Sequence, residues 1–329
     1  MKMAKQQSFG DYEYANKKKQ TRKEIFLNAM EELIPWGEWL ALIEPYYPKA
    51  GNGRPPREME TMLRMYLVQN WFNLSDEATE DAIYDIQSIR RFVGINLTEE
   101  SAPDATTLLH FRHLLEEHGL SKKMFDAIKC ALKYNGYMMT EGTIVDASII
   151  AAPTSTKNET KTRDPEMKST KKGNNYYFGM KGHIGVDSDS GFIHTVETTA
   201  ANEADITVAH KLLHGDEDFM YGDAAYIGTE KRDEFADKPN LSHQTMKRRQ
   251  SIKKLPECQS TDEARFHEKE KSRIRAKVEL PFHIVKNIFK FRKTPYGGLA
   301  KNTARLYTLF ALSNLYLCKL KGLSLIFQN

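Results

Sequence analysis

Three acidic residues stand where their type and order suggest chemistry. Asp146 alternates with apolar residues within 143–150, a pattern typical of a half-buried strand. Asp223 ends a short apolar stretch, 219–222, and Glu279 lies in a later segment with helical spacing. An acid inside an apolar strand needs an explanation, although each acid taken alone is equally well explained by an ion pair or a surface charge.

Carboxylates brought together predict a divalent-metal site. Two of them side by side repel each other, and Mg²⁺, which binds one or two carboxylates together with water and phosphate oxygens, relieves that repulsion. A third acid completes a site for two ions roughly 4 Å apart, which activate the attacking oxygen and stabilise the leaving oxygen of an in-line displacement. The three acids therefore predict metal-dependent phosphoryl transfer.

Two cations are expected to flank Glu279 on one helix face. Arg275 lies four residues before it and Lys286 seven residues after it, and both spacings return to the same face at about 3.6 residues per turn. Side chains there would hold phosphate groups. Because Pro281 must kink or restart the helix, the alignment of Lys286 is less certain than that of Arg275.

The elements that must position these residues follow an α/β order. Five stretches are expected to be strands: 143–150, 176–187, 192–199, 219–222 and 242–246. The second and third flank the turn 188–191, and helices at 205–213 and 228–236 connect the later strands. Antiparallel early strands followed by helical crossovers predict a mixed sheet of the ribonuclease H type, in which Asp146 and Asp223 lie beside each other.

The first 135 residues have helical periodicity. Apolar positions recur at helical spacing in three stretches, 25–34, 59–72 and 82–92. Ser75 and Asp104 are candidate N-caps of further helices. We therefore predict an all-α N-terminal domain over 1–135 and a ribonuclease H-like catalytic domain over 136–329, which includes a buried C-terminal helix at 306–318.

Short helices joined by tight turns are also typical of a helix-turn-helix. The helix after Asp104 ends at Gly119, and its first turns would offer side chains to base edges in the major groove. The residues expected to read DNA there are Thr106, Thr107, His110 and Arg112. A helical bundle without DNA contacts fits the same pattern equally well.

The charge distribution favours an anionic partner more than the net charge does. The 329 residues carry a net charge of +4, but 243–293 holds 15 Lys or Arg against 6 Asp or Glu. The stretch 155–175 reads as a long basic loop. The cations expected to contact DNA phosphates are Lys171, Lys172, Lys181, Lys247, Arg248 and Arg249. The alternative is a solvated charged surface.

Cysteine usage and apolar stretches exclude several classes of protein. Cys130, Cys258 and Cys318 are widely spaced, so neither a disulfide framework nor a zinc ribbon is encoded, and no Ser or Cys hydrolase motif occurs. The N-terminus lacks an apolar signal segment, and the longest apolar stretch falls short of the roughly 20 residues that cross a bilayer. We expect a cytoplasmic, nucleoid-associated protein of bacterial type that does not engage membranes.

A series of short strings follows in collinear order from about Ser8 to Leu317. In the first half these are Ile34-Pro35-Trp36, Gly53-Arg54-Pro55-Pro56 and Asp104-Ala105-Thr106-Thr107. In the second half they are Val145-Asp146-Ala147-Ser148, Arg163-Asp164-Pro165-Glu166-Met167, Tyr177-Phe178-Gly179-Met180-Lys181, His183-Ile184-Gly185-Val186-Asp187, Thr199-Ala200-Ala201-Asn202 and Arg275-x3-Glu279-x6-Lys286. No string is specific alone. In this order the chain resembles insertion-sequence transposases of the DDE class, specifically the insertion sequence five family.

The resemblance implies a helical N-terminal region that recognises terminal inverted repeats and a homodimer or higher oligomer assembled on double-stranded DNA ends. It makes Asp146, Asp223 and Glu279 the catalytic acids and the ligands of two Mg²⁺ ions, for which Mn²⁺ can substitute. Arg275 and Lys286 match the basic members of the signature around the third acid. The implied reaction frees a 3′-hydroxyl at the element end and joins it to target DNA.

Several positions depart from the family pattern. Ser272 stands where many members have Tyr, Ala225 where Gly is usual, and Pro295-Tyr296-Gly297-Gly298 where basic residues usually flank the Tyr. These changes leave the acids intact but make a catalytically impaired DNA-binding regulator one alternative. A nuclease of the same fold that cuts without joining is the other. His183 and Asp187 also match family motifs, although core or turn positions would explain them without catalysis.

Overall fold

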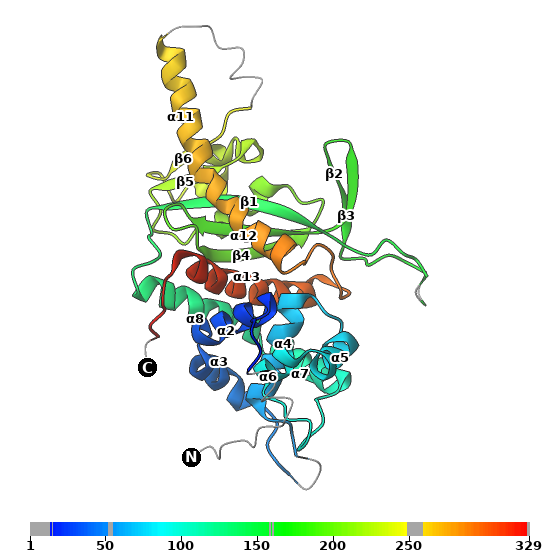
Figure 1. The fold of residues 1–329 in the computed structure, drawn as a ribbon. Helices are drawn as coiled ribbons and strands as arrows, with labels where there is room; N and C mark the ends of the chain where they lie inside the picture. Colours follow the sequence, from blue (N-terminus) through cyan, green and yellow to red (C-terminus); the bar gives the residue numbers. More distant parts are fainter. Residues whose placement is uncertain are drawn as a thin grey trace. The chain divides into compact units, whose positions relative to one another are not determined.

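The computed structural model describes residue 14 and residues 16–51, 55–157, 159, 161–248 and 259–327, with side chains from residue 262 onward in the last segment. The chain divides into two compact units. Unit 1 comprises Met1–Leu120 with Cys318–Ser324, and unit 2 comprises Ser121–Leu317 with Leu325–Asn329. Figure 1 labels the elements of both units.

Unit 1 is helical over its described residues. Its helices are α2 (Arg22–Leu33), α3 (Trp36–Ile43), the 3-10 turn η1 (Glu44–Tyr46), α4 (Met59–Phe72), α5 (Asp76–Asp85), α6 (Gln87–Val93) and α7 (Ala105–Glu117). Trp71 is buried at the centre, and its ring meets those of Phe26 and Phe92 edge-on at 5.4 and 5.5 Å. Such pairs add to the burial of apolar area, so the apolar positions of these helices form one core.

Two predicted caps begin helices of unit 1. Ser75 and Asp104 each accept the backbone N–H three residues on, at 3.1 and 2.6 Å, and start α5 and α7. Both predictions are confirmed. The predicted helical stretch 82–92 is interrupted at Ile86, whose extended backbone ends α5 and starts α6.

Unit 2 contains the mixed sheet that the sequence predicts. Its strands are β1 (Gly142–Ala151), β2 (Lys168–Lys172), β3 (Asn175–Asp187), β4 (Ile193–Ala200), β5 (Phe219–Gly222) and β6 (Ser242–Thr245). They follow the order β2-β3-β1-β5-β6, with β4 paired to β3 (Figure 1). Strand β3 runs antiparallel to β1 and β4, whereas β5 is parallel to β1 and β6 is parallel to β5.

Helix α13 (Leu299–Lys321) packs along β4. It contains the buried helix predicted at 306–318. The Asn314 side chain accepts the N–H of Ile193 at 3.0 Å and donates to its carbonyl at 2.8 Å. The Tyr307 hydroxyl donates to the Val196 carbonyl at 3.0 Å. These polar contacts satisfy buried backbone groups of an edge strand and fix the helix against the sheet.

A second apolar cluster packs beneath the crossovers. It contains Val145 of β1, Met220 of β5 and the residues Ala209, Leu212, Tyr226, Phe235 and Leu241. The first crossover consists of α9 (Asp205–Val208) and the 3-10 turn η2 (Ala209–Leu212), within the predicted helix 205–213. This packing holds the ends of β1 and β5 in place.

Two predicted segments differ in the structure. The stretch 228–236 is not one helix but two separate 3-10 turns, η4 (Thr229–Lys231) and η5 (Asp233–Phe235), because the backbone is extended at Arg232 between them. The stretch 155–175 is not loop throughout, since it contains β2. Its exposed Lys, Ser and Thr residues pair with β3 without an apolar face, so no alternation marks the strand.

Helix α8 (Leu120–Tyr134) belongs to unit 2 from Ser121 onward, where the Phe125 and Tyr307 rings lie 5.8 Å apart. The two compact units divide at the start of α8, whereas the domain boundary predicted from the sequence, after residue 135, follows this helix. That boundary stays a prediction. Across the described ranges, no helix combines the length and apolar character needed to cross a membrane.

Candidate active site

Asp146 and Asp223 are brought together by the parallel register of β1 and β5. The last parallel pair is Ile144 opposite Tyr221. Asp146 follows Ile144 by two residues, and Asp223 follows Tyr221 by two residues. The Asp146 side chain is 16% exposed, and its carboxylate accepts the N–H of Ala147 at 2.7 Å. Asp223 lies just beyond β5 and caps the following turn, accepting the Ala225 N–H at 2.8 Å. Asp146 therefore lies beside the end of β5 as predicted, although it is in the middle of β1 and not at its end.

Glu279 is the first residue of a short helix that follows a change in helical geometry. Helix α11 (Gln259–Arg275) passes into the 3-10 turn η6 (Ala276–Val278) and then into α12 (Glu279–His283). Pro281 lies in the first turn of α12, where its missing N–H leaves no helical hydrogen bond unmade. The restart that the proline predicts is therefore present, and it leaves the Glu279 side chain 61% exposed.

The Arg275 guanidinium joins two of the three acids. Its Nη1 donates to Asp146 Oδ2 at 2.9 Å and its Nη2 donates to Glu279 Oε1 at 2.8 Å. A planar guanidinium suits such a double contact because its donors point in fixed directions. The helix acid is thereby held next to the strand acid, with a cation between them.

The Asp146 carboxyl group has an altered proton affinity. Burial raises its pKa to about 6, and the like charges of Asp223 and Glu279 act in the same direction. The Ala147 N–H and the Arg275 guanidinium oppose them without cancelling the effect. The site therefore favours additional positive charge.

The donor set can be tested for its fit to a divalent metal ion. As the side chains stand in the described part of the chain, no group of three or more His, Cys, Asp or Glu residues is arranged to hold a metal ion. The Arg275 guanidinium lies between Asp146 and Glu279. The donor set nevertheless fits a hard divalent cation, because carboxylate oxygens are the ligands that Mg²⁺ prefers and their mutual repulsion remains to be relieved.

Tyr226 adds an observation that the sequence analysis missed. It is fully buried, its N–H donates to the Asp223 carbonyl at 3.1 Å, and its hydroxyl has no hydrogen-bond partner among the described residues. Burial raises its pKa well above 10, and the charges of Asp146, Asp205 and Asp223 raise it further. A buried donor without a partner beside carboxylates can hold a metal-bound carboxylate in place, which supports the fit.

Lys286 lies in the π-helical turn η7 (Ile284–Ile288) and points at β1. Its Nζ donates to Ser148 Oγ at 2.7 Å and to the Ile149 carbonyl at 2.6 Å. Burial lowers its pKa to about 8, and the charge of Lys172 contributes. Ser148 follows Asp146 by two residues, so the cation lies on the same side of β1 as the acid.

Two residues predicted to contact DNA have other partners. Arg112 is 6% exposed and forms a double contact with the Asp76 carboxylate at 2.5 and 3.1 Å, so it cannot reach a base edge as it stands. Lys181 donates to Asp205 at 2.8 Å and to the Glu203 carbonyl at 2.5 Å. Sequence spacing could not reveal these pairings, because each partner lies more than 20 residues away.

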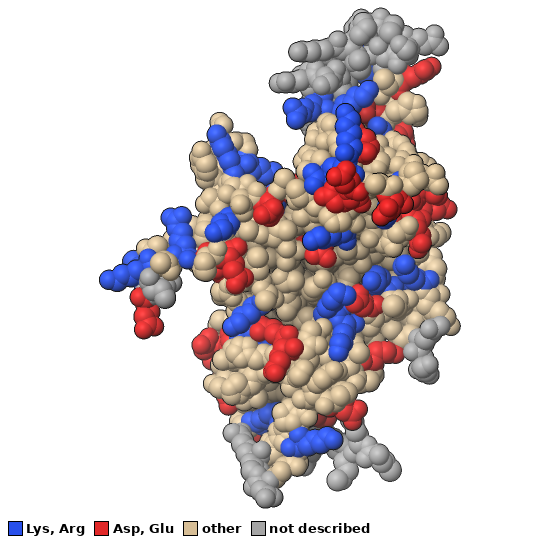
Figure 2. Space-filling view, turned by 180° about the vertical axis from the view of Figure 1, so that it is seen from behind, with Lys and Arg blue, Asp and Glu red and all other residues tan. Residues whose placement is uncertain are grey.

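The other residues predicted to contact DNA are exposed or half-buried, as far as the structure describes them. Exposed residues are Thr106 and His110 on α7, Lys171 and Lys172 on β2, and Lys247 and Arg248 after β6, while Thr107 is half-buried. Arg249 lies outside the described residues. Figure 2 shows Lys and Arg side chains interspersed with Asp and Glu on the face seen from behind.

The motif residues His183 and Asp187 have structural partners. His183 is buried, and its Nε2 lies 2.8 Å from Thr199 Oγ1 on the neighbouring strand. Burial lowers its pKa to about 4, so the ring is neutral at physiological pH. The Asp187 carboxylate accepts the N–H groups of Met139 and Asp189 at 3.0 and 3.1 Å and fixes the turn after β3.

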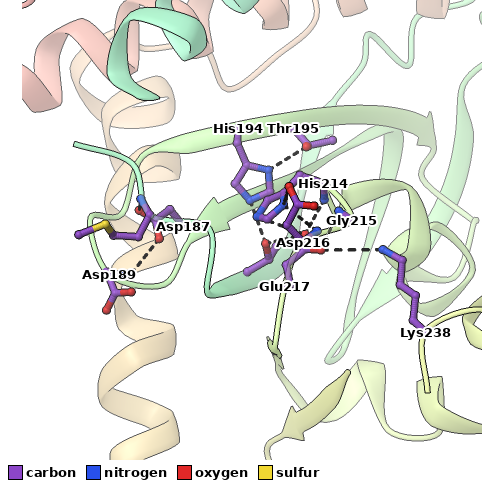
Figure 3. A network of polar contacts seen from close by, with 11 residues as sticks. Asp187, Asp189, His194, Thr195, His214, Gly215, Asp216, Glu217 and Lys238 are labelled. Atoms are coloured by element: carbon purple, nitrogen blue, oxygen red, sulfur yellow. Dashed lines mark hydrogen bonds and ion pairs between the residues drawn. The ribbon is translucent and has the colours of Figure 1, made fainter. Parts of the chain in front are cut away.

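A buried polar network at the start of β1 was also missed (Figure 3). The Thr143 hydroxyl donates to Glu217 at 3.0 Å and lies 3.1 Å from His194 Nε2. The His194 ring meets the His214 ring edge-on at 5.0 Å, and Gly215 donates its N–H to Glu217 at 2.8 Å. Burial lowers the pKa of both histidines, so their rings are neutral. The two rings stabilise the start of β1.

Comparison with known families agrees with this arrangement. Residues 138–315 match the family model of the transposase DDE domain, and residues 15–114 match a model described as a transposase domain (DUF772). The first match covers more than half of the chain and contains the strands and helices that carry the three acids. A DDE domain has a ribonuclease H-like fold, which the mixed sheet of unit 2 fits. The predicted DNA transposase function is confirmed, and the chain belongs to the family of DDE transposases.

Proposed function

We propose that Asp146, Asp223 and Glu279 are the catalytic acids of this transposase and hold two Mg²⁺ ions, for which Mn²⁺ can substitute. The observation that carries the proposal is the Arg275 guanidinium, which contacts Asp146 at 2.9 Å and Glu279 at 2.8 Å. It links an acid on β1 to an acid on α12. The register of β1 and β5 supports Asp223 as the third member.

Each side chain would have a distinct task. When bound, the ions would polarise the phosphate and lower the pKa of the attacking oxygen. Arg275, released from the carboxylates, would bind phosphate oxygens with its planar fork. Lys286, held beside Ser148, would neutralise a neighbouring phosphate. Burial of Asp146 excludes water from one side of the site and strengthens these charges.

The proposed reaction consists of two displacements at phosphorus. Water attacks the phosphodiester at the element end, and the bond to the leaving 3′-oxygen breaks to free a 3′-hydroxyl. This hydroxyl then attacks a phosphorus of the target strand, forms the new phosphodiester and releases a 3′-oxygen of the target. One set of carboxylates serves both steps because both are in-line transfers.

DNA recognition is assigned to the helical first part of the chain. We propose that 1–135 forms an all-α domain that binds terminal inverted repeats, with Thr106, Thr107 and His110 near base edges. The exposure of Thr106 and His110 in the first turns of α7, which the Asp104 cap begins, supports this. Assembly on DNA as a homodimer or larger oligomer, membership of the insertion sequence five family and a nucleoid-associated cytoplasmic location belong to the same proposal.

The test is strand cleavage and joining on a duplex that carries the inverted repeats flanking the gene. D146N, D223N and E279Q should each reduce cleavage by at least about 1,000-fold while duplex binding changes little. D262N is the matched control, because Asp262 is an exposed acid of α11. Full cleavage by any one of the three variants would refute the assignment of that acid. Cleavage without joined product in the wild type would identify a nuclease instead.

A further inference from the structure

The first part of β3 leaves the main sheet and forms a two-stranded ribbon with β2. Strand β1 ends at Ala151, opposite Gly179, and β4 ends at Ala200, opposite Met180. Residues 168–178, which we call the β2–β3 hairpin, therefore pair with each other except at the base, where Lys168 lies opposite Gly179 and the Phe178 carbonyl accepts the Ala152 N–H at 2.7 Å; Figure 1 shows the hairpin projecting from the sheet. Their two-residue loop begins at Gly173, which has a φ of 62°.

The hairpin carries cations and aromatic rings on both faces. Lys171 lies opposite Tyr176, and its ammonium is 5.5 Å from the ring centre. On the other face, Tyr177 lies opposite Thr170 and shares its side with Lys168 and Lys172. No acidic residue occurs between Glu166 and Asp187. This is the composition of a surface for polyanions.

Nothing in the fold of unit 2 explains why these rings are exposed. Tyr176 is 76% exposed and Tyr177 is 37% exposed. A lone two-stranded ribbon without an apolar face gains little from burial and is marginally stable in water. Two adjacent exposed rings among lysines form a patch that a partner can cover.

The hairpin lies on the side of the catalytic cations. Lys172 is close enough to Lys286 for its charge to help lower the Lys286 pKa, and Lys286 contacts β1 two residues beyond Asp146. Tyr176 lies eight residues along β3 from Ile184, the partner of Asp146. At about 3.3 Å per residue the two positions are roughly 26 Å apart along the strand, which corresponds to about 8 base pairs of duplex.

We propose that the β2–β3 hairpin enters a groove of the DNA duplex whose end lies at Asp146. In this arrangement Lys168, Lys171 and Lys172 contact phosphates. The Tyr176 ring contacts the bases or sugars. The major groove admits a two-stranded ribbon, and the charge of the hairpin matches the DNA backbone. This inference rests on the proposed function, because it places the cleaved phosphate at the three acids. It adds a contact within one helical turn of the cleavage point.

The two kinds of side chain should respond differently in a binding experiment. Binding of the full-length protein to a labelled duplex is measured over a range of salt concentrations. Replacing Lys168, Lys171 and Lys172 together by Ala should reduce the slope of log K against log salt by up to about 3. Tyr176→Ala should weaken binding roughly tenfold and leave that slope unchanged, because the ring carries no charge.

Matched controls come from α8, whose outer face carries the same residue types. Replacing Lys122, Lys123 and Lys133 by Ala removes three exposed lysines, and Tyr134→Ala removes an exposed tyrosine. These controls should leave the affinity and the salt slope near wild type. All hairpin substitutions are at exposed positions, so thermal unfolding should be unchanged.

A photoreactive phenylalanine analogue at position 176 provides an independent measurement. It should crosslink to DNA within about 8 base pairs of the cleavage point, and the same group at position 134 should not. Unchanged binding by both hairpin variants, or a crosslink to a second copy of the chain, would overturn the inference and leave the proposed function standing. A wild-type protein that binds no duplex at all would overturn both.

Discussion

Arg275 and Asp146 are 129 positions apart in sequence, yet the guanidinium Nη1 donates to the Asp146 carboxylate at 2.9 Å. The same side chain reaches Glu279 at 2.8 Å, one helical turn further on. A single cation therefore neutralises two acids that would otherwise repel each other. Under the proposed assignment of these acids, a divalent ion would take over this neutralising role from Arg275.

Removing the Arg275 cation should destabilise the metal-free protein and increase its response to metal. Arg275→Ala leaves Asp146 and Glu279 without the cation that they share, so we expect a loss of roughly 1–3 kcal/mol in the free energy of unfolding. Mg²⁺ should then raise the melting temperature of this variant more than that of the wild type. Calorimetry with and without Mg²⁺ measures both effects. An equal metal-induced shift in the two proteins would show that Arg275 does not occupy the ion position.

The raised pKa of Asp146 should make the stability of the metal-free protein depend on pH. Because the folded pKa is about 6, against 3.8 for the free group, the folded state binds the proton more tightly than the unfolded state. Stability should therefore fall by roughly 3 kcal/mol as pH rises from about 4 to about 6. Asp146→Asn should lose this part of the pH dependence. Denaturant unfolding across that pH range, with other groups common to both proteins, measures the difference.

Lys286 should make catalysis sensitive to alkaline pH. Burial lowers its pKa to about 8, so the ammonium is lost as pH rises through that value. If the charge binds phosphate, cleavage should decline above pH 8 in the wild type. Lys286→Arg should extend activity to higher pH because an arginine stays protonated, and Lys286→Met should be slow throughout. Identical pH profiles for the wild type and the arginine variant would exclude this role.

Two neighbouring residues on α7 should separate stability from DNA binding. Arg112→Ala leaves the Asp76 carboxylate without its bidentate partner, so unfolding should become easier by roughly 3 kcal/mol. His110→Ala changes an exposed side chain and should leave stability intact while weakening binding to the terminal repeat roughly tenfold. Thermal unfolding and repeat binding, each compared with scrambled duplex, measure the two effects. Equal binding of repeat and scrambled duplex by the wild type would move base recognition away from α7.

Local patterns in the sequence predict most of the catalytic framework. The alternation around Asp146 falls within β1, and the apolar run before Asp223 coincides with β5, because strands buried against helices carry a clear periodicity. The caps at Ser75 and Asp104 could also be predicted from the sequence, because capping depends on neighbours three residues away. Strand β2 escaped prediction because a ribbon exposed on both faces has no such signal.

Contacts between distant residues account for the other differences. Arg112 was expected on DNA from its place on α7, but its partner Asp76 lies 36 residues earlier. The pairing of His194 with His214 and the burial of Tyr226 depend on how β1, β4 and β5 pack. Sequence spacing within one helix or strand contains no information on such contacts.

Counting bound Mn²⁺ tests the central claim, that the three acids form a two-ion site. Electron paramagnetic resonance titration of the protein with a cleaved-end duplex should show two ions per protomer, and D146N, D223N and E279Q should each lose at least one of them. D262N should keep both. Retention of both ions by all three variants, or no bound ion in the wild type, would contradict the assignment of the site.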